Sequence, residues 1–530
     1  MTTEPVRVAG ELALPLRRHA RVRGDRDAIR TTGRTVTYRE LDDQVAEVAA
    51  GFRQLGLAHG GRVAIWMPNS VEWLVAYFAA TRVGAMVAPV NVLASGSEAD
   101  DILREIECDI LVSTAALSAR CSGDTTRHVV LVAESVESTG LTESNEPPTG
   151  GRLRWDDLFG QGRDDGSGPA ATDIASLYYS SATTGRSKAA VTLHSDIALN
   201  SMQQVIELGL TSDDVHLVTA SMSWAAGLHG VTLATLYAGG TIVLPELGSM
   251  SADKIAAAIS EWEPTTVILV PTLLRRLVED PASLQRIQES SLRLILTGSE
   301  PVPLPLFERV TEELPAVEVM QSYGMSEFPM MITLLRPEHA VERVGAAGLP
   351  TMFTQLALLQ EDGSIVDEGE GEILLRTPCT TRRYWNRPEE TEMGMRDGWL
   401  HTGDLGRIDE DGFLWITGRA KDLIITGGLN VAPLEVEKVL LRAMSGREVA
   451  VVGVPDPEFG ERIVAVFGGD ASVDRDEAIG VCKQTLPSYK VPREFFVYGD
   501  ELPKGPTGKL LKRAIRPWAE ERATATRGES

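Results

Sequence analysis

Short apolar runs alternate with segments of helical periodicity along most of the chain. Residues 39–57 repeat apolar side chains at the spacing of one helix face, and the apolar run Arg62–Trp66 follows and ends at Pro68-Asn69. Most of the later apolar runs are also flanked by helix-like segments, and they cover residues 109–112, 129–132, 267–270 and 292–296. This alternation predicts an α/β fold with mostly parallel strands.

The pattern changes after Pro350, where short strand-like runs are separated by glycine turns and acidic turns. Residues 361–363 and 409–412 are turns of this kind. The pattern predicts a small β-rich subdomain over about residues 350–418. From Asp422 onward a compact α+β unit of roughly 110 residues follows, which is a plausible size for an independent domain.

Composition and charge narrow the class of protein. A chain of 530 residues is too long for one hydrophobic core and predicts about two to four domains. A formal charge of −24 argues against nucleic acid or an anionic membrane as a partner, because both are bound through basic patches. The four cysteines are widely spaced and form no CxxC pair, so they indicate neither a zinc site nor a disulfide framework. No leader and no run of about 18 apolar residues is evident, so we expect a cytoplasmic protein without a membrane span.

Four polar motifs follow one another along the chain. The first, at 179–188, reads YSSATTGRSK, and its amides, hydroxyls and lysine suit the oxygens of a phosphate. The second is QSYGMSE at 321–327, and the third is HTGD at 401–404 with GRAKD at 418–422. The fourth, LPKGPTGK at 502–509, ends on a lysine. Each motif alone is typical of a loop or a turn, but four in this order are hard to explain as loops.

Together the motifs resemble the adenylate-forming superfamily, which includes acyl- and aryl-CoA synthetases, firefly-luciferase-like enzymes and the adenylation domains of peptide synthetases. The match begins near residues 36–41 and continues to Arg513 with every major motif in the family's order. The resemblance implies Mg²⁺-dependent attack of a carboxylate on ATP to give an acyl adenylate, followed by transfer of the acyl group to coenzyme A.

The resemblance also implies a domain division. It predicts a large N-terminal adenylation domain of βα subdomains over residues 1–420, which includes the β-rich subdomain. It predicts a smaller, mobile α+β C-terminal domain over residues 421–530, with the hinge at Lys421. In this family the C-terminal domain rotates between the two half-reactions.

The resemblance assigns roles around the phosphates. The contacts to the β- and γ-phosphates would come from Thr183, Thr184, Gly185 and Lys188, and Ser181 would also bind the nucleotide. Glu327 and Thr184 would be the metal ligands, since Mg²⁺ prefers hard oxygen donors. Lys509 would bridge the carboxylate and the α-phosphate, and Ser326 stands beside the α-phosphate where threonine is more common.

The remaining roles concern the nucleoside and coenzyme A. The segment Gly298-Ser299-Glu300-Pro301 resembles the adenine-binding strand end, with Tyr323 stacked on the base and Gly324 next to it. Asp404 would accept hydrogen bonds from the ribose hydroxyls, and Arg419 would support the ribose and phosphate. Gly427-Gly428 resembles the loop that faces the pantetheine tunnel.

The chain departs from the family pattern in two places. Ala182, Ser187 and Ala189 replace a glycine, a proline and a glycine of the phosphate loop, and alanine resists positive φ. We therefore expect a working loop with either weaker ATP binding or an unusual substrate.

The second departure lies in the acyl pocket. Trp224 stands near a histidine that often gates this pocket, in a stretch that also holds Gly227 and His229. Trp224 either narrows the pocket or is a packed aromatic, and we expect His229 to be structural.

Several functions stay open at this point. The favoured one is an acyl- or aryl-CoA ligase that acts on a small or medium carboxylic acid. A relative could load a carrier protein, pass the acyl group to an amine, or activate nitrite or another non-carboxylate oxyanion. A nucleotide-binding pseudoenzyme is the non-enzymatic alternative. The sequence does not indicate the oligomeric state of the protein.

Overall fold

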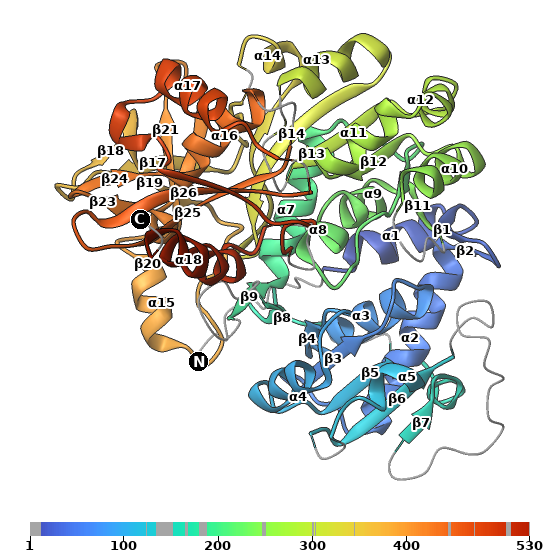
Figure 1. Ribbon diagram of the computed structural model, residues 1–530. Helices are drawn as coiled ribbons and strands as arrows, with labels where there is room; N and C mark the ends of the chain where they lie inside the picture. The colour runs from blue at the N-terminus through green and yellow to red at the C-terminus, as the bar shows by residue number, and fades with distance from the viewer. Residues whose placement is uncertain are drawn as a thin grey trace. The chain divides into compact units, whose positions relative to one another are not determined.

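The computed structural model of the chain is shown in Figure 1. It describes residues 12–122, 125–133, 152–164, 168–179, 188–245, 251–298, 302, 304–343, 345–443, 447–470, 472–504 and 510–528. Contacts among these residues divide the chain into two units. Unit 1 holds the described residues up to Gln355 together with Arg376–Gly398, and unit 2 holds Leu356–Leu375 and the residues from Trp399 onward.

Unit 1 contains a seven-stranded sheet with the order β7-β6-β5-β3-β4-β8-β9. All of its pairings are parallel except β8 with β9. The strands are β3 (Arg62–Trp66), β4 (Met86–Pro89), β5 (Ile110–Thr114), β6 (His128–Val132), β7 (Arg152–Arg154), β8 (Ile174–Tyr179) and β9 (Ala189–Leu193). The helices along this part of the chain are α2 (Tyr38–Gln54), α3 (Val71–Val83), α4 (Gly96–Glu105), α5 (Ala115–Ser118) and the 3₁₀ helix η1 (Trp155–Leu158). Capping boxes at Thr37 and Ser95 explain where α2 and α4 begin.

A nine-stranded sheet with the order β16-β15-β14-β13-β12-β10-β11-β1-β2 also belongs to unit 1. The strands from β1 to β14 in this order pair in parallel, and β2, β15 and β16 pair antiparallel. The strands are β1 (Asp27–Thr31), β2 (Thr35–Thr37), β10 (Val215–Leu217), β11 (Thr241–Leu244), β12 (Thr266–Leu269), β13 (Leu294–Gly298), β14 (Glu318–Met325), β15 (Phe328–Leu335) and β16 (Leu349–Pro350).

The helices associated with this second sheet follow the same alternation. They are α1 (Leu14–Val22), α7 (His194–Glu207), α8 (Ala225–Leu228), α9 (Thr232–Ala238), α10 (Ala252–Trp262), α11 (Pro271–Glu279), α12 (Pro281–Gln288), α13 (Leu304–Glu313) and α14 (Pro337–Ala340). The segment 376–398, which also belongs to unit 1, carries α15 (Pro388–Gly394) and β20 (Met395–Arg396).

The main core of unit 1 gathers around α3. This helix is apolar on nearly all sides, and its side chains are buried from Val71 to Val83 with few exceptions. A helix of this kind needs neighbours on every side. The core cluster around it accordingly joins residues of β3 and β4 with residues of α9 and β11, so one core serves both sheets.

Unit 2 begins with a mainly antiparallel sheet. Its strands are β17 (Gln355–Leu359), β18 (Ile365–Val366), β19 (Gly369–Arg376), β21 (Trp399–Ile408) and β22 (Leu414–Arg419). The order runs β18-β17-β19-β21, and β22 pairs with β21. The sheet consists of the short strands that the sequence pattern predicts for this region. It ends where the 3₁₀ helix η2 (Ala420–Asp422) begins.

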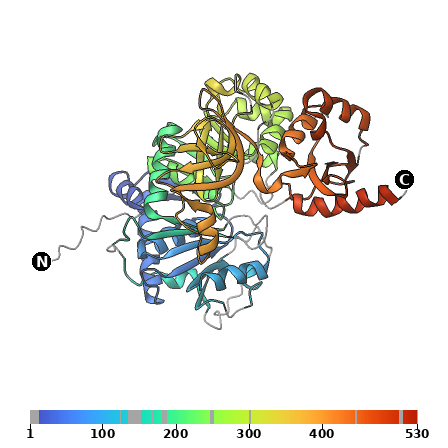
Figure 2. The same ribbon diagram turned by 90° about the vertical axis from the view of Figure 1, so that its left-hand side faces the viewer.

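A second sheet of unit 2 has the order β24-β23-β26-β25, and β27 pairs with β26. Its strands are β23 (Ile424–Thr426), β24 (Leu429–Val431), β25 (Val449–Asp456), β26 (Gly460–Phe467) and β27 (Glu494–Val497), and its helices are α16 (Pro433–Ala443), α17 (Arg475–Thr485), η3 (Ser488–Lys490) and α18 (Lys512–Gly528). Side chains of β25 alternate between two clusters. Val449 and Val451 face α16 and α17, and Ala450 and Val452 face α18, so helices cover both faces (Figure 2).

These observations confirm the predicted α/β multidomain fold with a large N-terminal part and a smaller C-terminal part. Contacts group the β-rich sheet with the residues that follow Lys421, whereas the sequence prediction grouped it with residues 1–420. A hinge at Lys421 stays a prediction. Among the described residues, no helix has the length and apolar character needed to cross a bilayer.

Candidate active site

Glu327 lies in the tight turn that joins β14 to β15 in unit 1. Its backbone carbonyl accepts hydrogen bonds from the backbone N–H of Thr381 (2.8 Å) and from the hydroxyl of Thr380 (3.1 Å). Its carboxylate Oε1 accepts a hydrogen bond from the Tyr384 hydroxyl at 2.9 Å. The segment 380–384 therefore fixes both the backbone of Glu327 and one of its carboxylate oxygens.

The same segment is held in place by β9. The Trp385 N–H donates to the Ala189 carbonyl at 2.9 Å, and the Val191 N–H donates to the Arg383 carbonyl at 3.1 Å. This pairing joins parts of the chain that are about 190 residues apart in sequence, as the register of Ala190 with Tyr384 shows. The edge of β9 thus supports the turn that carries Glu327.

Lys188 directly precedes β9. Its Nζ lies 5.3 Å from the centroid of the Tyr384 ring, within the range of a cation–π contact. Burial and the neighbouring charge of Glu327 raise the pKa of Tyr384 well above its usual range, so its hydroxyl stays protonated. We call Lys188, Glu327 and Tyr384 the Glu327 corner. The first two are predicted site residues, and Tyr384 was missed.

No sequence pattern marks Tyr384 as functional. It stands in an ordinary polar stretch, and its two contacts come from β9 and from the β14–β15 turn, both distant in sequence. A pairing of this kind is visible only in the folded chain.

The described adenine-binding candidates, Gly298, Tyr323 and Gly324, lie at the ends of two adjacent parallel strands. Gly298 ends β13 and pairs with Ser322 in β14. A Cβ added to Gly298 would lie 2.5 Å from the Ser322 carbonyl oxygen, so glycine is required here. Tyr323 and Gly324 follow at the same end of β14, just before Ser326. In open α/β sheets ligands bind at the carboxyl ends of parallel strands, which is where these residues lie.

The predicted acyl-pocket residues surround the short helix α8. Trp224 precedes the helix and is half-buried, and Gly227 lies within it. A Cβ on Gly227 would lie 2.0 Å from the Ser221 carbonyl oxygen, so this tight turn also requires glycine.

His229, which ends α8, is buried deep in unit 1. Its ring packs edge-on against Tyr178 with centroids 4.9 Å apart. Burial lowers the pKa of His229 to about 3, and no described residue hydrogen-bonds either ring nitrogen. These observations agree with the structural role expected of this histidine.

Asp404 and Arg419, the predicted ribose-binding residues, lie opposite each other on β21 and β22 of unit 2. Arg419 Nε lies 2.9 Å from Asp404 Oδ1. The Asp404 side chain is 8% exposed and that of Arg419 is 43% exposed. The pair places a carboxylate near the surface, where an arginine fixes its orientation.

Glu372 on β19 contacts β21 just before Asp404, where the register between the two strands shifts. Its Oε1 accepts a hydrogen bond from the Gly403 N–H at 3.1 Å, and its Oε2 lies 3.3 Å from His401 Nδ1. Sequence reasoning missed Glu372. The alternation of its strand gives no sign that its carboxylate turns toward the HTGD motif.

Gly427 and Gly428 form the turn between β23 and β24. Their φ angles are 58° and 79°, and Thr426 pairs with Leu429 across the turn. A two-residue hairpin with two positive φ angles favours glycine at both positions. Lys421 lies in η2, directly after β22.

Several predicted site residues lie outside the described residues, and their roles stay predictions. They are Ser181, Thr183, Thr184, Gly185, Ser299, Glu300, Pro301 and Lys509. The altered loop positions Ala182 and Ser187 also lie there.

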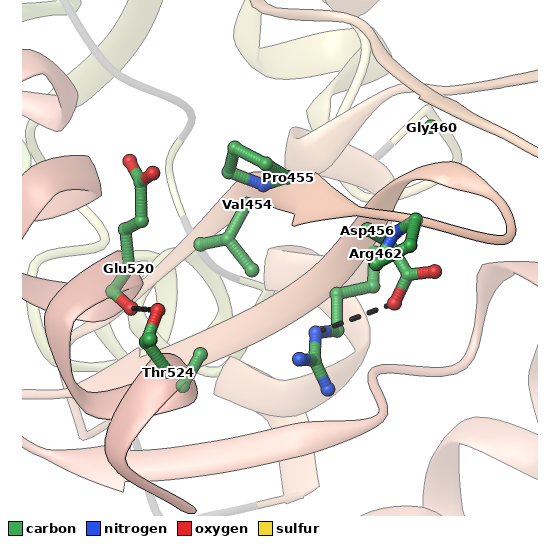
Figure 3. Close-up of a pocket in the computed structure, with 9 residues that line it drawn as sticks. Val454, Pro455, Asp456, Gly460, Arg462, Glu520 and Thr524 are labelled. Carbon is green, nitrogen blue, oxygen red and sulfur yellow. Dashed lines mark hydrogen bonds and ion pairs between the residues drawn. The ribbon is translucent and has the colours of Figure 1, made fainter. Parts of the chain in front are cut away.

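A surface hollow of about 380 Å³ lies in unit 2 between the β25–β26 hairpin and α18 (Figure 3). Arg462 Nε lies 3.6 Å from Asp456 Oδ2 on the strand side, and the Thr524 hydroxyl donates to the Glu520 carbonyl at 2.8 Å on the helix side. None of the described site candidates lines this hollow. We therefore assign it no part in the reaction.

Comparison with known proteins identifies the family. The model of the AMP-binding enzyme family matches residues 16–385. The chain belongs to this family. The model of the AMP-binding enzyme C-terminal domain matches residues 435–509. Both matches confirm the resemblance to the adenylate-forming superfamily.

Individual relatives of this AMP-binding enzyme are CoA ligases. A feruloyl-CoA synthase from an Amycolatopsis species is 33% identical over 505 residues, which cover 95% of this chain and 97% of the relative. The anthranilate CoA ligase AuaEII, solved in complex with anthranoyl-AMP, has a TM-score of 0.86 and 26% identity and covers 98% of both chains.

A third relative is the o-succinylbenzoate CoA synthetase MenE from Bacillus subtilis, solved with ATP and a magnesium ion. It has a TM-score of 0.79 and 28% identity, and the match covers 94% of this chain and 98% of that one. The chain is an AMP-forming acid–thiol ligase of the acyl/aryl-CoA synthetase type. It activates a carboxylic acid with ATP as an acyl adenylate and transfers the acyl group to coenzyme A.

Proposed function

We propose that this ligase activates an aromatic or other small to medium carboxylic acid and that the Glu327 corner binds the phosphates of Mg²⁺-ATP. The observation that carries the proposal is the corner itself, in which a carboxylate and an ammonium group both contact one tyrosine side chain. A carboxylate for a metal ion and a cation for phosphates are the two groups that phosphoryl chemistry requires.

The donor set of the corner fits Mg²⁺. Among the described residues no three His, Cys, Asp or Glu side chains come together to form a metal cage. Mg²⁺ is usually bound by one or two carboxylates together with substrate phosphates and water, and it does not need such a cage. Glu327 offers a hard carboxylate oxygen, and we assign Thr184 as its partner. When bound, the ion neutralises negative charge on the phosphate oxygens.

Two lysines of the chain would stabilise the same negative charge on the phosphate oxygens. Attack of the acid at the α-phosphorus adds negative charge to the phosphate oxygens, which positioned cations stabilise. We assign Lys188 to the β- and γ-phosphates and Lys509 to the α-phosphate and the attacking carboxylate, with the Ser326 hydroxyl beside them. The acid is already ionised at neutral pH, so no residue has to act as a general base.

The nucleoside contacts complete the proposal. Gly298, Ser299, Glu300, Pro301, Tyr323 and Gly324 would bind adenine. Asp404 would accept hydrogen bonds from the ribose hydroxyls, and its ion pair with Arg419 orients its carboxylate.

Two relatives and one side chain support an aromatic acid as the substrate. The feruloyl-CoA synthase and the anthranilate CoA ligase are named for aromatic acids. Trp224 is half-buried beside α8 and offers a flat aromatic surface, against which an aromatic acid packs favourably.

We further propose Lys421 as the hinge and Gly427-Gly428 as the loop that meets coenzyme A. Lys421 directly follows the strand that carries Arg419, and the glycine turn lies only a few residues beyond. We also propose a cytoplasmic location, as the sequence predicts, which fractionation of cells can test.

The deciding experiment is pyrophosphate release from Mg²⁺-ATP across a panel of aromatic and aliphatic acids plus nitrite. Each acid is tested with and without coenzyme A, and Lys509→Ala serves as the blank. We expect release that depends on an aromatic or short acid and rises with coenzyme A. Release with long-chain acids alone, or with nitrite alone, would contradict the proposed acid class. Turnover that depends on a carrier protein or an amine in place of coenzyme A would contradict the acceptor.

A further inference from the structure

Tyr384 makes two contacts for which the roles proposed above give no reason. Its hydroxyl donates to Glu327 Oε1 at 2.9 Å, and its ring face lies 5.3 Å from Lys188 Nζ. The two partners come from different strands, since Glu327 lies in the β14–β15 turn and Lys188 precedes β9. Tyr384 is the side chain that both of them contact.

Tyr384 is itself firmly held. Its side chain is 9% exposed. Its backbone N–H donates to the Thr391 hydroxyl at 3.0 Å, and it pairs in register with Ala190 of β9. The tyrosine is therefore a rigid element between two longer and more flexible side chains.

We infer that Tyr384 is a positioning residue that fixes the Glu327 carboxylate for a divalent cation and the Lys188 ammonium for the phosphates of ATP. The inference rests on the proposed function, because it needs Glu327 and Lys188 in those roles. Tyr384 itself contacts neither ligand in this scheme.

The physical reason is preorganisation. A glutamate and a lysine each lose rotamer freedom when they bind a ligand, and a contact that orders them beforehand removes that loss from binding. The hydroxyl acts on Glu327 and the ring face acts on Lys188. The hydroxyl donates to Oε1 of the carboxylate at 2.9 Å, and this hydrogen bond fixes the direction of the carboxylate.

Two substitutions separate the two contacts. Tyr384→Phe removes the hydroxyl and keeps the ring, so it frees Glu327 alone. Tyr384→Leu removes both, so it frees Glu327 and Lys188. The matched control is Tyr38→Phe, which removes a buried hydroxyl that donates to the Gly240 carbonyl at 2.6 Å in the same unit, away from every residue with a proposed role in the site.

The readout is ATP binding by calorimetry without any acid present, at a series of Mg²⁺ concentrations and in EDTA. Mg²⁺ should strengthen ATP binding, and the Mg²⁺ concentration at which half of this effect is reached is the quantity compared. We expect this concentration to be about tenfold higher in Tyr384→Phe, because the variant loses a hydrogen bond to a charged group. Its ATP affinity in EDTA should stay near that of the wild type. We expect Tyr384→Leu to weaken binding in EDTA as well, by about two- to fivefold, which is the scale of a cation–π contact. Tyr38→Phe should change neither quantity.

The variant Glu327→Gln distinguishes a failure of the inference about Tyr384 from a failure of the proposed function. If Glu327→Gln shifts the Mg²⁺ dependence and Tyr384→Phe shifts it no more than Tyr38→Phe, the inference is wrong and the role of Glu327 stands. If Glu327→Gln leaves the Mg²⁺ dependence unchanged, both are wrong. The double variant should behave like Glu327→Gln alone. An additional shift from Tyr384→Phe in that background would mean that the tyrosine acts elsewhere, which also overturns the inference.

Discussion

Asp404→Asn separates the proposed ribose contact from the stability of unit 2. Asparagine keeps the shape of the side chain and the oxygen that accepts from Arg419 Nε at 2.9 Å. Arg419 is 43% exposed, so solvent screens the pair, and the substitution should cost less than about 1 kcal/mol of stability. A carboxylate that accepts ribose hydroxyls contributes about 1.5–3 kcal/mol, so ATP binding should weaken by about 10- to 100-fold.

The assay is ATP binding by calorimetry and unfolding by urea on the same preparation. Glu461→Gln is the matched control, because Arg516 lies 2.6 Å from Glu461 in the same unit and is 51% exposed. Glu461→Gln should lose as little stability as Asp404→Asn and bind ATP normally. Equal ATP affinity in the two variants would refute the ribose role, and a large loss of stability in Asp404→Asn alone would refute the estimate of a screened pair.

Three further predictions concern the reaction and the pH dependence of stability. Lys509→Ala should abolish adenylate formation and leave transfer from a preformed adenylate largely intact, and equal loss of both half-reactions would contradict its role. Lys421→Pro should impair thioester formation more than pyrophosphate release, and normal thioester formation would argue against a hinge there. The unfolded chain protonates His229 as the pH falls below about 6.5, whereas burial lowers its pKa to about 3 in the folded protein. Its contribution to stability is therefore present above pH 6.5 and is lost as the pH falls. His229→Phe should reduce the loss of stability between pH 7 and pH 5 by about 2 kcal/mol, measured by urea unfolding, and an unchanged pH dependence would show that the ring is protonated in the fold.

Much of the fold could be predicted because its strands are buried in parallel sheets. The runs 63–66 and 129–132 are continuous and apolar, as is typical of strands in parallel sheets, and they form most of β3 and most of β6. The helix expected over residues 39–57 is α2, which its capping box starts at Tyr38. By contrast, β10 (Val215–Leu217) has three residues and includes a buried histidine, so no periodicity marks it.

The candidate site could be predicted only where a motif is contiguous. Glu327 and Asp404 stand in short polar motifs, and the sequence therefore points to them directly. Tyr384 and Glu372 act through hydrogen bonds to distant segments, and their own surroundings in sequence are ordinary. Pairing between strands brings them to the site, and such pairing cannot be inferred from local patterns.

The Glu327 corner limits which of the substitutions in the phosphate loop can affect ATP binding. Serine in place of the family's proline at position 187 removes a restriction on the backbone and would loosen the approach to Lys188. Lys188, however, directly precedes β9, and its ammonium lies over the Tyr384 ring, so a contact outside the loop holds this side chain. The replacement of glycine by alanine at position 182 bears instead on the backbone amides of the loop, because amides can wrap a phosphate only where the backbone reaches the required φ angles. A weakened ATP affinity in this ligase would accordingly be restored by Ala182→Gly and not by a proline at position 187. Affinity restored by Ser187→Pro alone would mean that the approach to Lys188 is the weak point.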